Sequence, residues 1–336
     1  MTNTIGIRRE DKNKWERRVP LTPTHVQQLI QQHGLNVVVQ PSPIRALPND
    51  AYGAAGANVQ EDLSPADVVL AVKEIPVDLL LPNKTYLFFS HTIKGQSYNM
   101  PLLQKLLDLN CQLIDYERIV DEHNRRLIFF GRHAGLAGMI DTLHTLGQRL
   151  AAEGIDTPFN DIKLTYQYGD LATAQQAIRQ AGRRIAEEGL PLQLTPLVVG
   201  VAGYGNVSRG AQEILDLLPT QTISPTELPA LADEGQAKRN VIYKVIFKEI
   251  DTVEPLAEGQ PFDLPEFFQH PERYRSQFEQ YLPHLSVLVN CIYWDTPYPR
   301  LLTKDKARQM YTAGPAPKLR VIGDISCDIE GGIEVT

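Results

Sequence analysis

The stretch Val68-Val-Leu-Ala-Val-Lys-Glu-Ile-Pro76 is an apolar run of strand length that stops abruptly on a titratable side chain, Lys73. A second run, Tyr86-Leu-Phe-Phe-Ser-His-Thr-Ile-Lys-Gly-Gln96, has the same form and stops on His91. In open parallel α/β sheets, ligands bind at the carboxyl ends of the strands. We therefore predict that Lys73 and His91 are a catalytic pair at one edge of a sheet, and that the rest of the chain holds substrate and cofactor against them.

Polar side chains follow four successive predicted strands in this part of the chain. They are Arg8, Arg9 and Glu10, then Lys73 and Glu74, then Ser90 and His91, and finally Asp115 and Glu117. The carboxyl ends of parallel strands share one edge of a sheet, so these side chains are expected to converge. A polar loop after any single strand would be ordinary, and the prediction therefore depends on all four together.

Strands that alternate with short helices predict an α/β fold built on doubly wound parallel sheets. We expect helices over 25–33, with Thr22 as the N-cap, over 101–109, from Ala134 to about Glu153, and over 173–188. Arg125–Gly131 reads as a further strand. The small residues Ala134, Gly135 and Gly138 at a helix start permit close approach of another backbone or of a ligand.

The length of 336 residues exceeds what one hydrophobic core usually serves. We expect a catalytic and substrate-binding domain over 1–135 and a dinucleotide-binding domain over 136–336, with an insertion near 225–283. The formal net charge of -7 argues against nucleic acid or an anionic membrane as partner and favours a small-molecule substrate. There is no signal-peptide segment and no apolar run of about 18 residues, which predicts a cytoplasmic protein. Three dispersed cysteines without a C-x-x-C pair suggest reduced thiols, and no metal site is predicted.

The stretch Leu197-Val-Val-Gly-Val-Ala-Gly-Tyr-Gly-Asn-Val-Ser-Arg-Gly-Ala211 predicts a buried strand, a glycine turn and the start of a helix. Gly203-x-Gly205-x-x-Ser208 is the dinucleotide fingerprint, with serine in place of the third glycine. The second glycine lets the backbone approach a pyrophosphate, and the helix amino terminus supplies donors for its charge. A structural turn with no cofactor is the alternative.

The acid that usually holds the ribose 2′-hydroxyl is missing from the strand expected next along the chain. That strand is Thr220–Ser224, and Ser224 stands where the acid would be. Its absence favours NADP(H) over NAD(H), with Lys238 or Arg239 as partners for the 2′-phosphate. Both could equally be solvated surface charges. The run Val241–Phe247 falls within the predicted insertion, which could lie over the active site or at a subunit contact.

A lysine and a histidine that face a nicotinamide cofactor suit reactions at an amino or imino carbon. Such reactions need one group that moves protons as a carbinolamine collapses, and a base that keeps the attacking amine neutral. Arg9, Arg18 and Arg126 lie near the same edge, and arginine binds carboxylates in bidentate fashion. The predicted substrate therefore carries an amine and more than one carboxylate.

Motifs along nearly the whole chain resemble the lysine-ketoglutarate reductase and lysine-forming saccharopine dehydrogenase family, in the superfamily of the alanine dehydrogenase and transhydrogenase N-terminal domain. The motifs are Arg8-Arg-Glu-(x)5-Glu-Arg-Arg-Val-Pro-Leu-Thr-Pro23, Val72-Lys-Glu-Ile-Pro76, Phe88-Phe-Ser-His-Thr-Ile-Lys94, Leu113-Ile-Asp-Tyr-Glu117, Phe130-Gly-Arg-His-Ala-Gly-Leu-Ala-Gly138, Gly205-Asn-Val-Ser-Arg-Gly-Ala211, Asn290-Cys-Ile-Tyr-Trp294 and Asp324-Ile-Ser-Cys-Asp328.

The resemblance implies two Rossmann-like domains that flank a cleft, and the reversible reduction of the imine of L-lysine and 2-oxoglutarate to saccharopine. It implies Lys73 and His91 as the acid–base pair. Four side chains match substrate ligands or neighbours that tune the pair: Glu16, Arg18, Glu117 and Arg126. The positions that match cofactor contacts are Gly203, Gly205, Asn206, Ser208 and Asp324. The segment 225–283 resembles the reductase part of bifunctional animal and plant enzymes, which favours NADPH.

The family's chains continue well past the segment that matches Asp324–Glu334, with strands and a helix that complete the fold. Homo-oligomer formation is left open. Two alternatives to the leading hypothesis remain. One is an alanine-dehydrogenase-like enzyme that uses a 2-oxo acid and ammonia, which would leave Arg126 and Glu117 without a role. The other is a catalytically silent protein that binds the cofactor without turnover.

Overall fold

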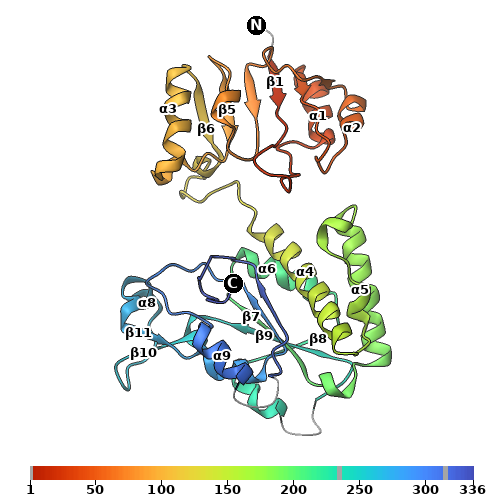
Figure 1. Ribbon diagram of the computed structural model, residues 1–336, viewed down its shortest axis with the longest axis vertical. Coiled ribbons are helices and arrows are strands. Elements are labelled where there is room, and N and C mark those ends of the chain that lie inside the picture. Colours follow the sequence, from red (N-terminus) through yellow and green to blue (C-terminus); the bar gives the residue numbers. More distant parts are fainter. Residues whose placement is uncertain (1–2, 233–236, 313–316) are drawn as a thin grey trace. The chain divides into compact units, whose positions relative to one another are not determined.

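A computed structural model describes residues 3–232, 237–312 and 317–336. The chain divides into two compact units, Met1–Phe129 and Phe130–Thr336 (Figure 1). Each unit contains its own parallel sheet covered by helices, and each is described by itself. The α/β class predicted from the alternation of strands and helices is confirmed.

The first unit is built on a six-stranded sheet in the order β3-β2-β1-β4-β5-β6, with every neighbouring pair parallel. The strands are β1 (Thr4–Ile7), β2 (Asn36–Val39), β3 (Asn58–Val59), β4 (Val68–Leu70), β5 (Thr85–Phe88) and β6 (Gln112–Asp115). The chain changes direction across the sheet at β1. Strands β2 and β3 lie on one side of β1, and β4, β5 and β6 lie on the other. The four strands predicted to end on polar groups, β1, β4, β5 and β6, are consecutive neighbours in this sheet.

Helices cover both faces of this sheet. Side chains alternate across a strand, so Val37 and Val39 pack toward α1 (Pro23–His33) and α2 (Asn49–Ala54), whereas Val38 belongs to the core on the opposite face. That opposite core includes Leu102 and Leu106 of α3 (Met100–Asp108). Thr22 caps α1 as predicted, because its hydroxyl accepts a hydrogen bond from the His25 amide.

The second unit has a five-stranded parallel sheet in the order β13-β12-β7-β9-β8. The strands are β7 (Leu197–Ala202), β8 (Thr220–Ile223), β9 (Ile242–Phe247), β12 (Val287–Asn290) and β13 (Val321–Asp324), and β10 (Val253–Pro255) pairs with β11 (Tyr274–Ser276) in a separate antiparallel ladder. The helices are α4 (Gly131–Ala152), α5 (Leu171–Glu188), α6 (Asn206–Leu215), α7 (Glu249–Thr252), α8 (Leu264–Gln269) and α9 (Lys304–Thr312).

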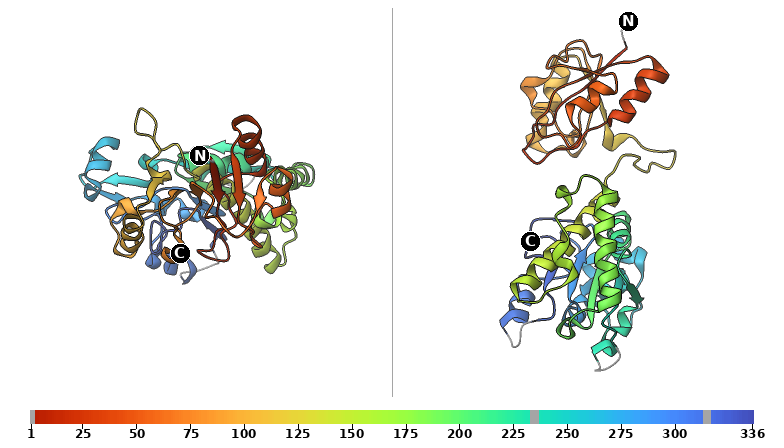
Figure 2. Two further views of the ribbon diagram at one scale, coloured as in Figure 1. Left: turned by 90° about the horizontal axis from the view of Figure 1, so that it is seen from above. Right: turned by 90° about the vertical axis from the view of Figure 1, so that its right-hand side faces the viewer.

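Helices pack against the sheet of this unit (Figure 2), and the two faces of the sheet have separate cores. One core joins the strands to α4, α5 and α6, and the other joins them to the segment 278–285 and α9. Helices α4 and α6 cross at very short range: a Cβ added at Gly135 would lie 1.9 Å from the Val207 carbonyl oxygen, and one at Gly210 would lie 2.0 Å from the Arg132 carbonyl oxygen. The small residues predicted at the start of α4 therefore permit contact with another backbone.

Two predicted features differ from the structure. Arg125–Gly131 is not a strand: Arg126 forms only an isolated bridge with Val120, and α4 already begins at Gly131. Leu127 and Phe129 are exposed, whereas Ile128 packs against the cluster of Val72, Phe89 and Tyr116. The run Val241–Phe247, predicted within an insertion, supplies β9, which lies between β7 and β8 in the sheet. Among the described residues, no helix is long and apolar enough to cross a membrane.

Candidate active site

Lys73 and His91 lie just beyond the carboxyl ends of two adjacent strands, β4 and β5. The ladder between these strands continues past their ends, because the Phe89 amide donates to the Val72 carbonyl at 3.1 Å. Lys73 is therefore one residue beyond Val72, and His91 is two residues beyond Phe89. Both side chains are half-buried. The structure thus brings the predicted catalytic pair to one short section of the sheet edge.

The imidazole of His91 lies between two carboxylates. Its Nδ1 lies within hydrogen-bonding distance of Glu117 Oε2, at 3.2 Å, and its Nε2 lies 3.7 Å from Glu74 Oε1. That Glu74 oxygen is buried and has no hydrogen-bond partner among the described residues. The ring also stacks on Phe89, with 6.4 Å between the ring centroids.

His91 has a left-handed backbone conformation, with φ of 55°. This region is uncommon for residues other than glycine, and histidine is among the residues that enter it more readily. Nearby, the Ser90 hydroxyl donates to the Asp115 carboxylate, which also accepts from the Ser90 amide at 3.2 Å. These bonds fix the end of β5 to the end of β6 and determine the direction in which His91 leaves the sheet.

The backbone at Lys73 is bound by the buried carboxylate of Glu10, which follows β1 in the chain. Glu10 accepts from the amide of Val72 at 2.7 Å and from the amide of Lys73 at 3.0 Å. Burial raises the pKa of Glu10, the two amide hydrogen bonds oppose that rise, and the neighbouring Glu16 adds to it. Among the described residues, the Lys73 ammonium has no hydrogen-bond or ion-pair partner, so its proton is not committed to a structural contact.

Glu16 and Arg18 form a bidentate ion pair beside Lys73. Arg18 Nε donates to Glu16 Oε1 at 2.7 Å and Nη2 donates to Oε2 at 2.5 Å. Burial alone would raise the pKa of Glu16, but the hydrogen bond and charge of Arg18, and more weakly the charge of Lys73, lower it. Glu16 is 7% exposed. The pair therefore contributes a buried carboxylate and a half-exposed guanidinium to the same edge.

Arg126 also reaches this edge, where its Nη1 lies 3.4 Å from Glu117 Oε1. One carboxylate, that of Glu117, thus lies between a predicted acid–base group and a predicted substrate ligand. The six residues predicted as catalytic or substrate-binding in the first unit all lie in this region: Glu16, Arg18, Lys73, His91, Glu117 and Arg126.

Three charged residues of this region received no role from the sequence. Glu74 lies beside His91, Glu10 binds the backbone at Lys73, and Lys12 Nζ donates to Glu74 Oε2 at 2.6 Å. Burial would raise the pKa of Glu74, but the Lys12 hydrogen bond, with further help from the charges of Lys12 and His91, lowers it. Glu10 and Glu74 could have been identified from the sequence by their position directly after a strand. No pattern in the sequence marked Lys12 as a site residue.

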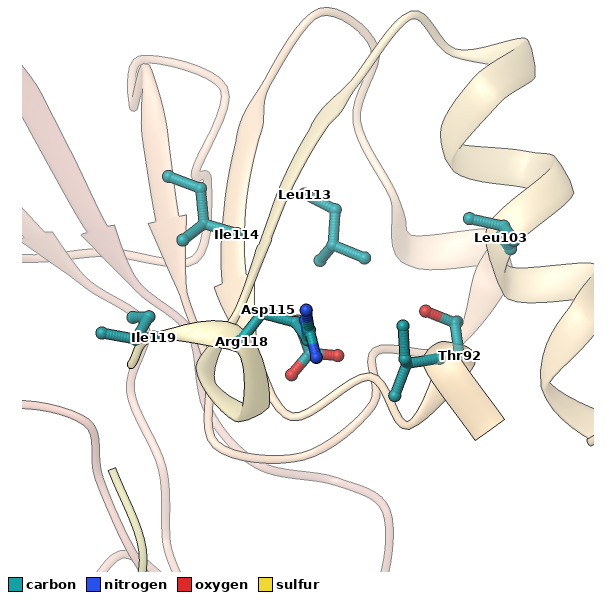
Figure 3. Close-up of a pocket in the computed structure, with 8 residues that line it drawn as sticks. Thr92, Leu103, Leu113, Ile114, Asp115, Arg118 and Ile119 are labelled. Atoms are coloured by element: carbon teal, nitrogen blue, oxygen red, sulfur yellow. The ribbon is translucent and has the colours of Figure 1, made fainter. Parts of the chain in front are cut away.

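A separate cavity of about 580 Å³ lies beside β6 (Figure 3). Five of its eight lining side chains are apolar: Ile93, Leu103, Leu113, Ile114 and Ile119. Its lining includes neither Lys73 nor His91. A substrate with several carboxylates does not suit such a surface, and we therefore place the chemistry at the charged edge and not in this cavity.

The glycine turn of the second unit lies between β7 and α6, as predicted. Gly203 follows β7 with φ of +95°, and a Cβ there would lie 3.3 Å from the Cys291 carbonyl oxygen. Gly205 is the N-cap of α6, and a Cβ there would meet no atom within 4 Å. A ligand that approaches Gly205 from the side of this Cβ would therefore meet no described atom there, which suits the predicted approach of a pyrophosphate.

The other predicted cofactor residues lie at the same edge in different surroundings. Asn206 is exposed in the first turn of α6. Ser208 is fully buried, and its hydroxyl accepts from Gln212 Nε2 at 2.9 Å, which is the environment of a packing residue. Asp324, at the end of β13, accepts from Asn290 Nδ2 at 2.9 Å and from the Thr336 hydroxyl at 2.5 Å. No group of three or more potential metal ligands occurs among the residues described.

Comparisons with known proteins agree with this architecture. Residues 6–137 match the family model "Alanine dehydrogenase/PNT, N-terminal domain". The chain is 41% identical to alpha-aminoadipic semialdehyde synthase of Arabidopsis thaliana and 40% identical to the mitochondrial protein of that name from Bos taurus, in each case over 98% of this chain. It covers 32% and 37% of those proteins, so it spans about one-third of their length. A solved L-alanine dehydrogenase has the same fold, with a TM-score of 0.56 at 19% identity over 98% of this chain and 76% of that chain.

Proposed function

Because residues 6–137 form an alanine dehydrogenase/PNT N-terminal domain and nearly the whole chain is homologous to one-third of alpha-aminoadipic semialdehyde synthase, we propose that this protein is a nicotinamide-dependent oxidoreductase that interconverts L-lysine plus 2-oxoglutarate and saccharopine. The observation that supports this most directly is the edge of the first sheet. There Lys73, which has no hydrogen-bond or ion-pair partner among the described residues, follows the strand next to the one that ends before His91, and His91 lies between two carboxylates. The resemblance in motifs and the fold are consistent with the proposal.

The reaction requires proton transfers that this edge can supply. The amine of the substrate lysine must lose a proton before it attacks the 2-oxo carbon, and the carbinolamine must gain one before it releases water to form the imine. His91 can hold a proton at either ring nitrogen, stabilised by Glu117 or Glu74. Lys73 can give or take a proton at Nζ. The nicotinamide, when bound, supplies the hydride that reduces the imine carbon.

The charged groups around the pair fit a substrate that carries both signs of charge. Arg18 and Arg126 are each about half exposed, with side-chain exposures of 44% and 45%. We assign them to the substrate carboxylates, since guanidinium groups bind carboxylates in bidentate fashion. Glu16 and Glu117 balance these arginines in the free protein and would attract the substrate amine. A single small 2-oxo acid would use only part of this arrangement.

The cofactor would be bound by Gly203, Gly205 and the amino terminus of α6, with Asn206 and Asp324 at the same edge. The sequence favours NADP(H) over NAD(H), because Ser224 stands where an acid would hold the ribose 2′-hydroxyl. The cytoplasmic location, the homo-oligomer and the roles of individual site residues stay predictions.

The deciding experiment mixes the protein with L-lysine, 2-oxoglutarate and either NADH or NADPH, and follows absorbance of the reduced nicotinamide. We expect oxidation that requires both L-lysine and 2-oxoglutarate. Replacing lysine by ammonia is the matched control, because an alanine-dehydrogenase-like enzyme would accept it with a 2-oxo acid. Absence of lysine-dependent oxidation with both cofactors would refute the proposal, and cofactor binding without any turnover would support the silent homologue.

A further inference from the structure

Glu10 binds the backbone at the point where the chain leaves the first sheet after β4. The ladder between β1 and β4 ends at Leu70, whose carbonyl accepts from the Arg8 amide at 2.9 Å. Beyond it the chain bends at Val72 and Lys73. Oε1 of Glu10 accepts from the Val72 amide at 2.7 Å, and Oε2 accepts from the Lys73 amide at 3.0 Å. One carboxylate therefore binds two successive amides, one with each oxygen.

This contact depends both on the bend and on the ionised acid. Successive amides converge on one anion where the backbone turns. An ionised carboxylate suits two converging donors, because it has two acceptor oxygens and no proton to donate. A glutamine at position 10 would have a single acceptor oxygen, and its NH₂ group would face one of the two backbone N–H groups. The bend at residues 72 and 73 therefore has a specific partner in Glu10.

Glu10 has this backbone contact in place of an ion pair. It is 7% exposed, and among the described residues no lysine or arginine pairs with it, since the nearby Arg18 pairs with Glu16. Burying a carboxylate without a paired cation costs free energy. The two amide hydrogen bonds oppose that cost, and they go to the backbone that carries Lys73.

Lys73 and Glu74, at this bend, both carry side chains of the proposed site. The charge of Lys73 lowers the pKa of Glu16, so the ammonium lies near that carboxylate. The Glu74 carboxylate lies 3.7 Å from Nε2 of His91. Rotation of the backbone at residue 73 would move both side chains. A displacement of about 1 Å at reacting groups is enough to slow catalysis about 100-fold.

We propose that Glu10 is a positioning residue for Lys73: it holds the bend after β4 and thereby keeps the Lys73 ammonium directed at the substrate. In this role Glu10 acts through the backbone of Lys73 and transfers no proton itself. The assignment rests on the proposed function, in which Lys73 transfers a proton. The alternative is that Glu10 only satisfies two backbone amides and supports the fold of the first unit as a whole.

A double-mutant cycle in the full chain separates these two roles. We expect Glu10→Gln to lower kcat about 10- to 100-fold while KM for L-lysine and 2-oxoglutarate stays within about twofold. The double variant Glu10→Gln/Lys73→Met should be no slower than Lys73→Met alone, because fixing the position of a side chain has no effect once that side chain is removed. Losses that multiply in the double variant, or wild-type kcat in Glu10→Gln, would overturn the assignment.

Two further variants complete the cycle. Glu61→Gln is the matched control, because Glu61 is an exposed acid of the same unit that pairs with Arg9, and kcat should be unchanged. If Glu10→Gln does not fold, Glu10→Asp takes its place in the same cycle with the same outcomes. This variant keeps the charge and shortens the side chain by one methylene group, so its oxygens no longer reach both amides.

Amide hydrogen exchange tests the contact without any turnover. We expect the amides of Val72 and Lys73 to exchange at least about tenfold faster in Glu10→Gln than in the wild-type protein, the size of one lost hydrogen bond to a charged group. Exchange should be unchanged in Glu61→Gln. Unchanged exchange in Glu10→Gln would overturn the assignment. Absence of lysine-dependent turnover in the wild-type protein would refute the proposed reaction, and faster exchange in Glu10→Gln would still support Glu10 as the residue that holds the bend at Lys73.

Discussion

Glu117 Oε2 lies 3.2 Å from Nδ1 of His91, so a carboxylate from the end of β6 orients an imidazole from the end of β5. The other oxygen of Glu117 lies 3.4 Å from Arg126 Nη1. One side chain therefore connects a group proposed to transfer protons with a group proposed to bind substrate. A substrate carboxylate that engages Arg126 would change the environment of His91 through Glu117.

Lys73→Met should lower kcat by the roughly 100- to 10,000-fold that the loss of a proton-transfer group costs. The methionine keeps most of the side-chain volume, and the backbone contacts of residue 73 with Glu10 do not involve the side chain. NADH or NADPH binding, followed by fluorescence, should be unchanged because the proposed dinucleotide site lies in the second unit. Wild-type turnover in this variant would remove Lys73 from the mechanism.

Arg126→Ala should raise KM for 2-oxoglutarate more than it lowers kcat, because it removes a carboxylate ligand and not a proton-transfer group. A loss of about tenfold or more in kcat/KM is expected for one charged hydrogen bond. The neighbouring Arg125→Ala is the matched control, since Arg125 is 74% exposed and pairs with Asp121. Equal kinetics of the two variants would favour an enzyme with a smaller substrate.

Glu16→Gln should lower the melting temperature of the protein at neutral pH, since it removes a buried, paired carboxylate. The pKa of Glu16 lies below its ordinary value of 4.5 in the folded protein, chiefly because Arg18 outweighs the opposing effect of burial. A carboxylate with a depressed pKa stabilises the fold above its unfolded-state pKa and loses that contribution as pH falls through the folded-state pKa.

The destabilisation by Glu16→Gln should therefore be about 1 kcal/mol or more near pH 7 and should vanish well below pH 4.5. Calorimetry of both proteins across this range measures the difference. A difference that grows as the pH falls would contradict the depressed pKa. Glu258→Gln, which is exposed, provides a control with no expected pH-dependent difference.

Gly205→Ala should weaken dinucleotide binding without destabilising the free protein. A Cβ at this position meets no protein atom within 4 Å, and φ of -75° is open to alanine. The methyl group would instead occupy the space in which the backbone approaches a pyrophosphate. We expect an unchanged melting temperature together with at least a tenfold rise in the dissociation constant for NADH or NADPH. Unchanged affinity would mean that the cofactor does not lie against this turn.

Local patterns in the sequence were sufficient to predict the class of the fold and the sheet edge at which the proposed catalytic residues lie. Apolar runs that end on Lys73 and His91, and a glycine turn between a strand and a helix, are properties of consecutive residues. The carboxyl ends of parallel strands lie at a common edge of the sheet. The family resemblance and the pattern of apolar runs together therefore predicted the side chains that lie near Lys73 and His91, namely Glu16, Arg18, Glu117 and Arg126. The sequence did not predict the contacts of Glu10 with Lys73 or of Lys12 with Glu74, because these contacts join residues about 60 positions apart.

The order of strands in the second sheet depends on tertiary structure. No local sequence pattern shows that β9 lies between β7 and β8. Which strands are neighbours depends on how the two faces of the sheet pack against the helices, which are α4, α5, α6 and α9. A search along the chain therefore led to Ser224 after β8, whereas the strand that pairs with β7 beside the glycine turn is β9. The sequence by itself determined the kinds of groups at each strand end. Only the tertiary structure decided which strand ends are neighbours, since that choice depends on contacts between residues distant in the chain.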